Sequence, residues 1–406
     1  MKICMLSRVL PAHAVGGMQD HVLSLSLQLS RYGHDVTVIT TRHPDGKGCE
    51  EIEGVFIHYL ATTKPVNFSR SWRRESVRAF AQFYGQKGFD LVHCQGSGGT
   101  YFLRCLEHRR WGLPAVISLH GLASDEIMTA WRLMRSSKSL LSKVLAVAKM
   151  LHQVYEHIAF TLPAAQNADA IIATSDQQRI AIQRICRVPE EKVYTVYNGI
   201  DVSRYSPEAY HIRDKLGLMN EDVLILVVAR LIEEKGVQFA IRSFPLILER
   251  VARCRLLIVG DGNFRSPLEK MAQQIGLSSH ILFVGTVPEA ELPSYYASAD
   301  VFVNSTIRAN GYDLTIVQAM ACGKPVVVSN IGSVPTLIAD GKDGLLVPPG
   351  DIVALAERVK RVLSDPGLAK MLGRNARKKV VERFSLEAMA KGTLRVYERV
   401  LQRRKS

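Results

Sequence analysis

Long apolar runs, paired cysteines and low-complexity tracts are all missing from this 406-residue chain. No uninterrupted apolar segment reaches the ~18 residues that a membrane-spanning helix needs, and the start of the chain shows no signal-peptide cleavage site. The sequence therefore predicts a soluble, cytoplasmic protein. The seven cysteines are odd in number and include no CxxC pair. Reduced thiols are therefore expected, and a disulfide framework or a zinc site is not.

Acidic residues are also few relative to basic ones. The chain has 52 Lys and Arg against 38 Asp and Glu, a net charge of +14, which favours anionic partners such as nucleotide sugars, anionic lipids or nucleic acid. No recognised nucleic-acid module and no interleaving of aromatic with basic residues is present, so nucleic acid is not an expected partner. The chain is longer than the roughly 250 residues that a single core supports, which predicts two domains.

Strands alternate with helical segments along both halves of the chain, a pattern typical of α/β folds with parallel sheets. In the first half, strands are expected at 2–6, 35–40, 55–59, 91–94, 115–119 and 170–174. A polar segment at 198–210 is interpreted as a linker. In the second half, strands are expected at 223–228, 255–259, 281–284 and 300–303, with helices at 237–250, 267–275, 289–297 and 315–322. The prediction is two doubly wound, Rossmann-like domains at 1–200 and 201–385, followed by a helical segment at 386–406.

The segment 304–329 (NSTIRANGYDLTIVQAMACGKPVVVS) has the strongest functional signature in the chain. It predicts a strand, a loop and a short helix at the carboxyl edge of a sheet. Backbone N–H groups and a helix N-terminus at such an edge attract phosphate and sugar oxygens. Asn310 in the loop and Gln318 on the helix are eight residues apart, so one ligand could contact both.

This segment resembles the donor site of glycosyltransferase family 4, the retaining GT-B group. The family pattern is Glu, seven residues, Glu, then Ala-Met-Ala-x-Gly, and here Asn310 and Gln318 replace both glutamates. The resemblance implies a GT-B fold whose two domains face an interdomain cleft, with the acceptor on the first domain and the nucleotide sugar on the second. It implies that the last helix, 386–406, crosses back to the first domain. The expected activity is that of a hexosyltransferase that needs no metal or other cofactor. It implies a UDP- or GDP-linked sugar as donor, with a glycan or a lipid-linked molecule as acceptor.

Arg230 and Lys235 lie in VARLIEEKG, directly after an apolar strand. Five residues apart across a loop, they could converge on one anion at the carboxyl edge of the sheet, where such folds bind ligands. Their charges could stabilise a departing diphosphate without a metal. The segment resembles the Arg-Leu-x-x-x-Lys-Gly phosphate clamp of the family, while a solvated surface pair is the alternative.

In the first domain, Gly16 and Gly17 resemble the glycine-rich loop through which the family approaches the donor diphosphate. The alternative is an ordinary structural turn, which Gly-Gly pairs often form. His120 follows a strand and resembles the histidine that contacts the transferred sugar; a structural histidine is the alternative. In the second domain, Gly262 in a GDG turn and Gly285 in GTVP resemble the turn and the base-binding region of the family.

The amides change what the donor pocket can do. Asn310 and Gln318 can still bind hydroxyls, but they cannot serve as acid, base or nucleophile. The resemblance places the transferred sugar against Asn310 and the main chain that follows, and the ribose against Gln318. Asp313 either restores a carboxylate to the pocket or caps the helix that begins near Thr315. The full set of expected donor-binding residues is Gly16, Gly17, Gly262, Gly285, Gly311, Tyr312, Asp313, Leu314, Thr315 and Gln318, with Arg230, Lys235, His120 and Asn310 as catalytic residues.

A basic, partly apolar stretch at 131–160 and a cluster formed by Arg70, Arg73, Arg74 and Arg78 give the first domain two cationic patches. Amphipathic basic helices can lie on anionic membranes, which would place the protein peripherally on the inner face of a membrane. A packed helix with a solvated basic face explains the stretch equally well.

Two other functions remain compatible with the sequence. A catalytically impaired GT-B protein, which binds a nucleotide sugar or acts as a scaffold, would follow from the loss of both glutamates, although Arg230 and Lys235 argue against complete loss. A dehydrogenase or a nucleotide-sugar epimerase is the other; the missing GxGxxG argues against a dehydrogenase.

Overall fold

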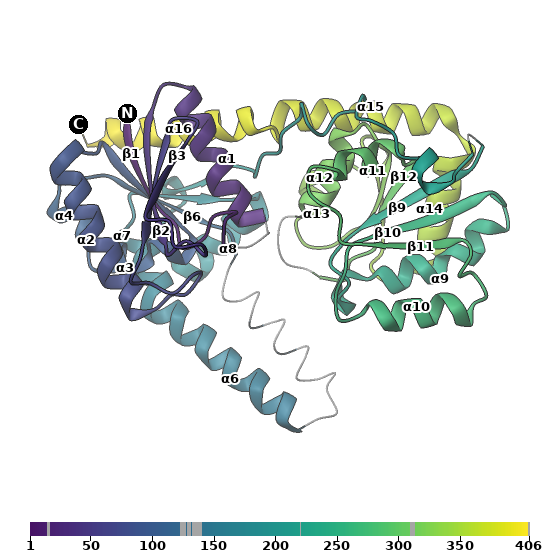
Figure 1. Ribbon diagram of the computed structural model, residues 1–406, viewed down its shortest axis with the longest axis horizontal. Helices are drawn as coiled ribbons and strands as arrows, with labels where there is room; N and C mark the ends of the chain where they lie inside the picture. The colour runs from purple at the N-terminus through teal and green to yellow at the C-terminus, as the bar shows by residue number, and fades with distance from the viewer. Residues whose placement is uncertain are drawn as a thin grey trace. The chain divides into compact units, whose positions relative to one another are not determined.

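The computed structural model describes residues 1–13, 17–121, 127, 131, 140–219, 221–308 and 313–404. The chain forms two compact units (Figure 1). The first unit is Met1–Asn198 together with Met389–Ser406, and the second is Gly199–Ala388. The sequence had placed these limits at 200/201 and 385/386.

The first unit contains an eight-stranded sheet in the order β3-β4-β2-β1-β5-β6-β7-β8. All neighbouring strands are parallel except β3 and β4, which pair as an antiparallel hairpin. The strands are β1 (Lys2–Leu6), β2 (Asp35–Thr41), β3 (Cys49–Ile52), β4 (Val55–Leu60), β5 (Leu91–Gln95), β6 (Ala115–Leu119), β7 (Ala170–Ala173) and β8 (Val193–Thr195). The sequence analysis did not predict β3 and β8, which are short strands at the two edges of the sheet.

Helices cover both faces of this sheet, as expected where central strands are buried along their whole length. They are α1 (Gly17–Arg31), α2 (Arg70–Lys87), α3 (Thr100–Arg104), α4 (Glu107–Arg110), α6 (Leu140–Glu156), α7 (Leu162–Asn167), α8 (Asp176–Cys186) and α16 (Leu386–Arg403), with short turns η1 (Gly96–Gly98), η2 (His157–Thr161) and η3 (Glu190–Lys192). Trp72 and Phe80 of α2 pack in the core beside Cys94. The neighbouring His93 points to the other face, where its Nδ1 lies 2.6 Å from the hydroxyl of Tyr397 on α16.

The second unit contains a six-stranded, fully parallel sheet in the order β11-β10-β9-β12-β13-β14. Its strands are β9 (Val223–Val228), β10 (Cys254–Val259), β11 (Ile281–Gly285), β12 (Val301–Asn304), β13 (Val326–Ser329) and β14 (Leu345–Val347). Its helices are α9 (Val237–Leu248), α10 (Arg265–Gln274), α11 (Leu292–Ser298), α12 (Leu314–Ala321), α13 (Val334–Leu337), α14 (Ile352–Ser364) and α15 (Pro366–Arg383), with η4 (Asp214–Leu216) and η5 (Glu233–Lys235). Helices α9, α10 and α14 pack through Phe244, Leu268 and Val359 into one core against the sheet.

The segment interpreted as a linker packs onto the second unit. Tyr205 is 2% exposed. The guanidinium of Arg377 donates to the backbone oxygens of Val202 and Tyr205, at 2.8 and 2.6 Å. The predicted architecture of two doubly wound parallel sheets is confirmed, and the chain between them is anchored to the second.

All seven cysteines are free thiols. Along the described ranges, no helix combines the length and the apolar character needed to cross a bilayer.

Candidate functional site

The carboxyl edge of the second sheet brings together most of the described residues that the sequence singled out. Strand β9 leads through Arg230 into η5, which ends at Lys235. Strand β12 ends at Asn304, and α12 begins next to Asp313 and carries Gln318. Because parallel strands end at one edge, segments about 80 residues apart in the sequence meet there.

Lys235 and Asp313 form an ion pair at the centre of this edge. Lys235 Nζ lies 3.0 Å from Asp313 Oδ2, and the two side chains are only 18% and 13% exposed. Asn304 donates from Nδ2 to the same carboxylate oxygen at 3.1 Å, and Thr315 donates from its hydroxyl to Asp313 Oδ1 at 2.8 Å. The carboxylate therefore receives three hydrogen bonds, and it fixes the position of the Lys235 ammonium group.

Burial alone would raise the pKa of Asp313. The charge of Lys235 and the hydrogen bonds from Thr315, Lys235 and Asn304 outweigh this effect and hold the pKa below its usual value. Asp313 also stands at the N-cap position of α12, but its side chain makes no capping bond to the helix backbone. Of the two interpretations offered for this residue, side-chain capping of the helix is not observed, and the carboxylate instead pairs with Lys235.

Gly236 directly follows Lys235, and its backbone conformation holds the lysine loop against the loop after β12. Its φ is +70°, a left-handed conformation that glycine adopts without strain. A Cβ at this position would lie 1.9 Å from the backbone oxygen of Ser305. The Ser305 hydroxyl donates to the Gly236 oxygen at 2.8 Å, and Ile307 N donates to the Glu234 oxygen. The loop after β12 is thus bonded directly to the loop that carries the lysine.

The GDG turn supports the loop that carries Arg230. A Cβ on Gly260 would lie 1.9 Å from Ala229 O, and one on Gly262 would lie 2.3 Å from Leu231 O. Leu231 N donates to Asp261 O at 2.9 Å. The side chain of Arg230 makes no hydrogen bond or ion pair with any residue that the structure describes, and the residue is exposed. Gly262 therefore packs against the loop that carries Arg230. The guanidinium group of Arg230 is available to bind an anion.

Gln318 is held between two tyrosines. The hydroxyl of Tyr296 donates to Gln318 Oε1 at 2.9 Å, and Gln318 Nε2 donates to the hydroxyl of Tyr205 at 2.9 Å. Burial raises the pKa of Tyr296 well above its usual value, so its hydroxyl stays protonated as a donor. An amide has two N–H groups and two acceptor lone pairs, so Gln318 keeps one of each for a ligand. The two tyrosines were missed in the sequence because nothing local marks them.

The other residues predicted to bind the donor lie in separate elements of the structure. Leu314 and Thr315 form the first turn of α12, and Gly285 ends β11 with φ +84°. Gly17 is the first residue of α1. Four predicted residues, Gly16, Asn310, Gly311 and Tyr312, lie outside the described residues.

In the first unit, His120 follows β6 at the carboxyl edge of the sheet. Its Nε2 lies 3.0 Å from Gln95 Oε1, and Nδ1 is buried with no hydrogen-bond partner among the residues that the structure describes. Burial lowers the pKa of His120 to about 4, so the imidazole is neutral at pH 7. With Gln95 Oε1 as acceptor, Nε2 carries the proton and Nδ1 is left as an unused acceptor.

Two further histidines surround His120 and were not singled out by the sequence. The rings of His21 and His120 are 4.6 Å apart. His93 contacts Ser118 through Nε2 at 2.8 Å, and burial lowers its pKa to about 3. Burial lowers the pKa of His21 as well, and any charge on His120 or His93 would lower it further. This edge of the first sheet is therefore lined by neutral imidazoles.

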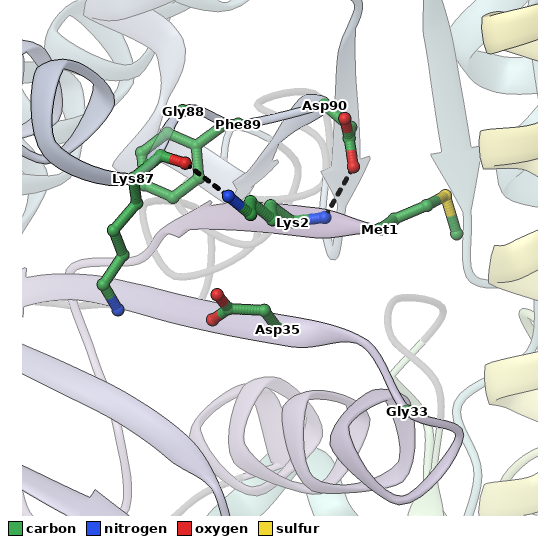
Figure 2. A pocket seen from close by; sticks show the side chains of 8 residues that line it. All are labelled: Met1, Lys2, Gly33, Asp35, Lys87, Gly88, Phe89 and Asp90. Atoms are coloured by element: carbon green, nitrogen blue, oxygen red, sulfur yellow. Dashed lines mark hydrogen bonds between the residues drawn. The ribbon is translucent and has the colours of Figure 1, made fainter.

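A hollow of about 510 Å³ lies at the opposite edge of the first sheet (Figure 2). Lys2 and Asp35 begin β1 and β2, and Asp90 precedes β5, so this is the amino edge. Lys2 N donates to Asp90 Oδ2, and Lys2 Nζ donates to Lys87 O, both at 2.7 Å. Ligands of open α/β sheets bind at the carboxyl ends of the strands, so this hollow is not a candidate active site.

Comparison with known proteins gives a consistent result. Residues 15–204 match the family model described as Glycosyltransferase Family 4, and residues 210–379 match the one described as Glycosyl transferases group 1. The chain is 31% identical over 406 residues to an uncharacterized glycosyltransferase of Methanocaldococcus jannaschii, an alignment that spans 98% of each chain.

Two solved structures resemble the whole chain. Sucrose-phosphate synthase of Thermosynechococcus elongatus has a TM-score of 0.76 at 22% identity, over 99% of each chain. Anabaena HepE in complex with UDP has a TM-score of 0.73 at 19% identity, over 98% of this chain and 100% of that one. These similarities confirm the predicted two-domain, Rossmann-like GT-B fold.

Proposed function

Because the chain belongs to the group 1, family 4 glycosyltransferases, we propose that it transfers a sugar from a UDP- or GDP-linked donor to a glycan or lipid-linked acceptor. As a member of this family it is a hexosyltransferase. The observation that carries the proposal is the pair of cations at the carboxyl edge of the second sheet. The Arg230 side chain has no partner among the described residues, and Lys235 is fixed by a buried carboxylate. A solved structure of the same fold binds UDP, which supports a nucleotide-linked donor.

The donor diphosphate is proposed to bind Arg230 and Lys235. Both side chains are cations that can donate charge-assisted hydrogen bonds to phosphate oxygens, and each such bond contributes roughly 1.5–3 kcal/mol. The positive charge becomes more important as the glycosidic bond breaks and the diphosphate gains charge. No metal is needed for this role. In the described part of the chain, no three His, Cys, Asp or Glu side chains cluster as a metal site would require.

The reaction is proposed to retain the anomeric configuration without a protein nucleophile. The bond from the anomeric carbon to the diphosphate oxygen breaks, and the acceptor oxygen bonds to that carbon from the same face. The acceptor proton passes to the departing diphosphate oxygen. Asp313 is ionised, but it accepts hydrogen bonds from Lys235, Asn304 and Thr315, so its role is to position Lys235. The amides at 310 and 318 are compatible with this route, because it needs no further carboxylate.

Hydroxyl recognition is proposed to use neutral side chains. Gln318 keeps one N–H and one lone pair for the ribose, and its two tyrosine contacts fix the plane of its amide. His120 offers the unused Nδ1 as an acceptor for a sugar hydroxyl. Because its pKa is about 4, that acceptor stays available throughout the physiological pH range.

We further propose that the protein associates peripherally with an anionic membrane surface through α6. This helix and η2, which follows it directly, expose an apolar row of Val144, Leu151, Tyr155 and Ile158, at 57%, 66%, 60% and 60%. Residues 144, 151, 155 and 158 recur at helical spacing and so share one side of the helix. Lys143 and Lys149 are also exposed on α6. The described part of the basic stretch thus fits an interfacial helix better than a fully packed one.

The membrane proposal has its own test. Leu151→Glu should abolish co-sedimentation with vesicles that contain anionic lipid, while Met219→Glu, at an equally exposed apolar residue in the second unit, should leave it unchanged. Equal co-sedimentation of both variants would refute the role of α6.

A catalytically impaired protein that binds the donor without turnover is the second candidate, favoured by the replacement of both family glutamates by amides. One experiment separates the two. A panel of sugar nucleotides is screened for thermal stabilisation, and the best binder is then tested for release of nucleoside diphosphate with acceptor candidates. Turnover that falls about tenfold or more in Arg230→Gln but not in Lys270→Gln, an exposed lysine on α10, supports the enzyme. Donor binding without turnover against any acceptor supports the alternative.

A further inference from the structure

Three arginines from separate segments meet at the carboxyl edge of the first sheet. Arg8 follows β1, Arg73 lies in the first turns of α2, and Arg104 ends α3. Their guanidinium groups surround two phenylalanine rings that pack against each other edge to face, with centroids 5.1 Å apart. We call Arg8, Arg73 and Arg104, with the rings of Phe68 and Phe160, the arginine cluster.

The rings hold the guanidinium groups in place. Arg73 lies 5.6 Å from the centroid of Phe68 and 5.2 Å from that of Phe160. Arg8 lies 5.6 Å from Phe68, and Arg104 lies 5.1 Å from Phe160. Cation–π contacts of this kind orient a guanidinium plane without neutralising its charge.

The cluster carries more positive charge than the protein itself balances. The guanidinium groups of Arg73 and Arg104 make no ion pair or hydrogen bond with any described residue. Arg8 donates to Val66 O and to the Ser97 hydroxyl, and its Nε is buried without a partner. Among the residues that the structure describes, Glu156 is the one carboxylate found to act on Arg8, and it also lies 3.6 Å from His152. Three fixed cations against one acid leave a net attraction for an anion.

An open cavity of about 480 Å³ adjoins the cluster. It is lined by Arg8, Pro65, Val66, Asn67, Phe68, His152 and Glu156. Its volume lies in the range of small-molecule sites. Apolar and cationic groups therefore border the same space, beside the strand ends where α/β sheets bind ligands.

We propose that this site binds a phosphate group on the acceptor, so that the acceptor is a phosphorylated molecule. Planar guanidinium groups form paired, charge-assisted hydrogen bonds to phosphate oxygens, which suits Arg73 and Arg104. The rest of the acceptor would lie against Phe68 and the neighbouring cavity wall. This inference rests on the proposed function, because it assigns the acceptor side of the same reaction.

The first test measures binding of inorganic phosphate by isothermal titration calorimetry. Arg73→Gln and Arg104→Gln should each weaken binding about 10-fold to 100-fold. Arg74→Gln removes an exposed arginine next to Arg73 that has no place in the cluster, so it should bind as the wild type does. Arg73→Lys keeps the positive charge but lacks the paired N–H donors of the guanidinium group, so it should weaken phosphate binding by an intermediate amount. Far-ultraviolet circular dichroism and the unfolding midpoint show whether each variant is folded.

The phosphate could belong to a lipid headgroup or to a soluble sugar phosphate. Dihexanoyl phosphatidic acid, kept below its micelle concentration, and glucose 6-phosphate are therefore titrated separately. Either compound binding more tightly than inorganic phosphate, and losing that affinity in Arg73→Gln, supports the proposal and identifies the source. Affinities that are the same in the wild type, Arg73→Gln and Arg104→Gln overturn it.

A matched variant in the second unit separates this inference from the proposed function. Phosphate bound at the donor site would be lost in Lys235→Gln and kept in Arg73→Gln. That result would refute the acceptor site while leaving the donor site intact. Retained phosphate binding with loss of UDP binding in Lys235→Gln would support both.

Discussion

The carboxyl edges of the two sheets hold their charges in opposite ways. In the second unit, Lys235 is paired with Asp313 inside a network of hydrogen bonds, and the side chain of Arg230, at the same edge, has no partner among the described residues. In the first unit, the histidines are neutral, and Arg73 and Arg104 have no acidic partner among the described residues. The same type of fold thus presents a pre-positioned cation at one edge and uncompensated cations at the other. We interpret the first arrangement as a binding site for a donor diphosphate and the second as a site for an acceptor anion.

The largest effect should come from removing the cation at the second edge. Lys235→Ala should lower kcat/KM about 100-fold or more, because it removes a charged contact to the leaving group. It should also lower the free energy of unfolding by roughly 3 kcal/mol, because Asp313 is left buried and unpaired. Steady-state kinetics and urea denaturation measure the two effects. Kinetics close to those of the wild type would show that the donor binds elsewhere.

The next largest effect should come from Gly236, which sets the position of Lys235. Gly236→Ala should lower the free energy of unfolding by about 2–4 kcal/mol, because the Cβ would meet the backbone oxygen of Ser305 in a left-handed conformation. Gly276→Ala is the matched control, with φ +73° and open space around the Cβ. It should lose only about 1 kcal/mol by the same measurement. Equal losses would mean that the contact with Ser305 is not tight.

Asp313→Asn tests the difference between the two sheet edges. It leaves Lys235 without a carboxylate partner, as Arg73 and Arg104 are in the first unit. The amide has only one oxygen, so it can accept at the position bonded to Thr315 or at the position bonded to Asn304 but not at both, and it no longer neutralises Lys235. The unfolding free energy should fall by about 1–3 kcal/mol at pH 7, and kcat/KM should fall about tenfold as the lysine loses its fixed position. Faster turnover in this variant would show that Asp313 restrains Lys235 and does not position it.

The smallest expected effect is a loss of folding stability at acidic pH. The pKa of His93 is lowered to about 3 and that of His120 to about 4. The unfolded chain therefore binds protons below about pH 6.5 while these folded histidines do not, so stability falls as the pH drops from about 6.5 toward 4. Asp313 has a lowered pKa, so its contribution is present above the usual carboxylate value of about 3.9 and is lost only below it.

Hydrogen exchange can test this difference between the units. Between pH 7 and pH 5, after correction for intrinsic exchange rates, β5 and β6 should lose more protection than β9 and β12. Equal losses in both sheets would contradict the assignment of neutral histidines to the first edge.

Much of the fold was predictable because the buried parallel strands are continuous apolar runs. Strands such as β9 and β12 are of this kind, and their positions followed from the sequence. The hairpin strand β3 was missed because its sequence, CEEI, has two acidic residues and no alternating pattern. Strand β14 has only three residues, too few to show a period.

The site was predictable only in part, because its contacts are tertiary. Local spacing singled out Arg230 and Lys235, but no local pattern could show that Lys235 pairs with a residue 78 positions away. Only one arginine of the arginine cluster could be singled out from the sequence. Arg73 lies in a basic run, whereas Arg8 and Arg104 are isolated in the sequence. The tyrosines that hold Gln318 come from two different segments and carry no motif.

The most direct test of the donor site is a crystal structure with the UDP or GDP sugar that stabilises the protein most. The account predicts diphosphate oxygens within about 2.7–2.9 Å of Lys235 Nζ and within reach of the Arg230 guanidinium. A diphosphate bound away from both cations, with Lys235 still paired to Asp313, would contradict it.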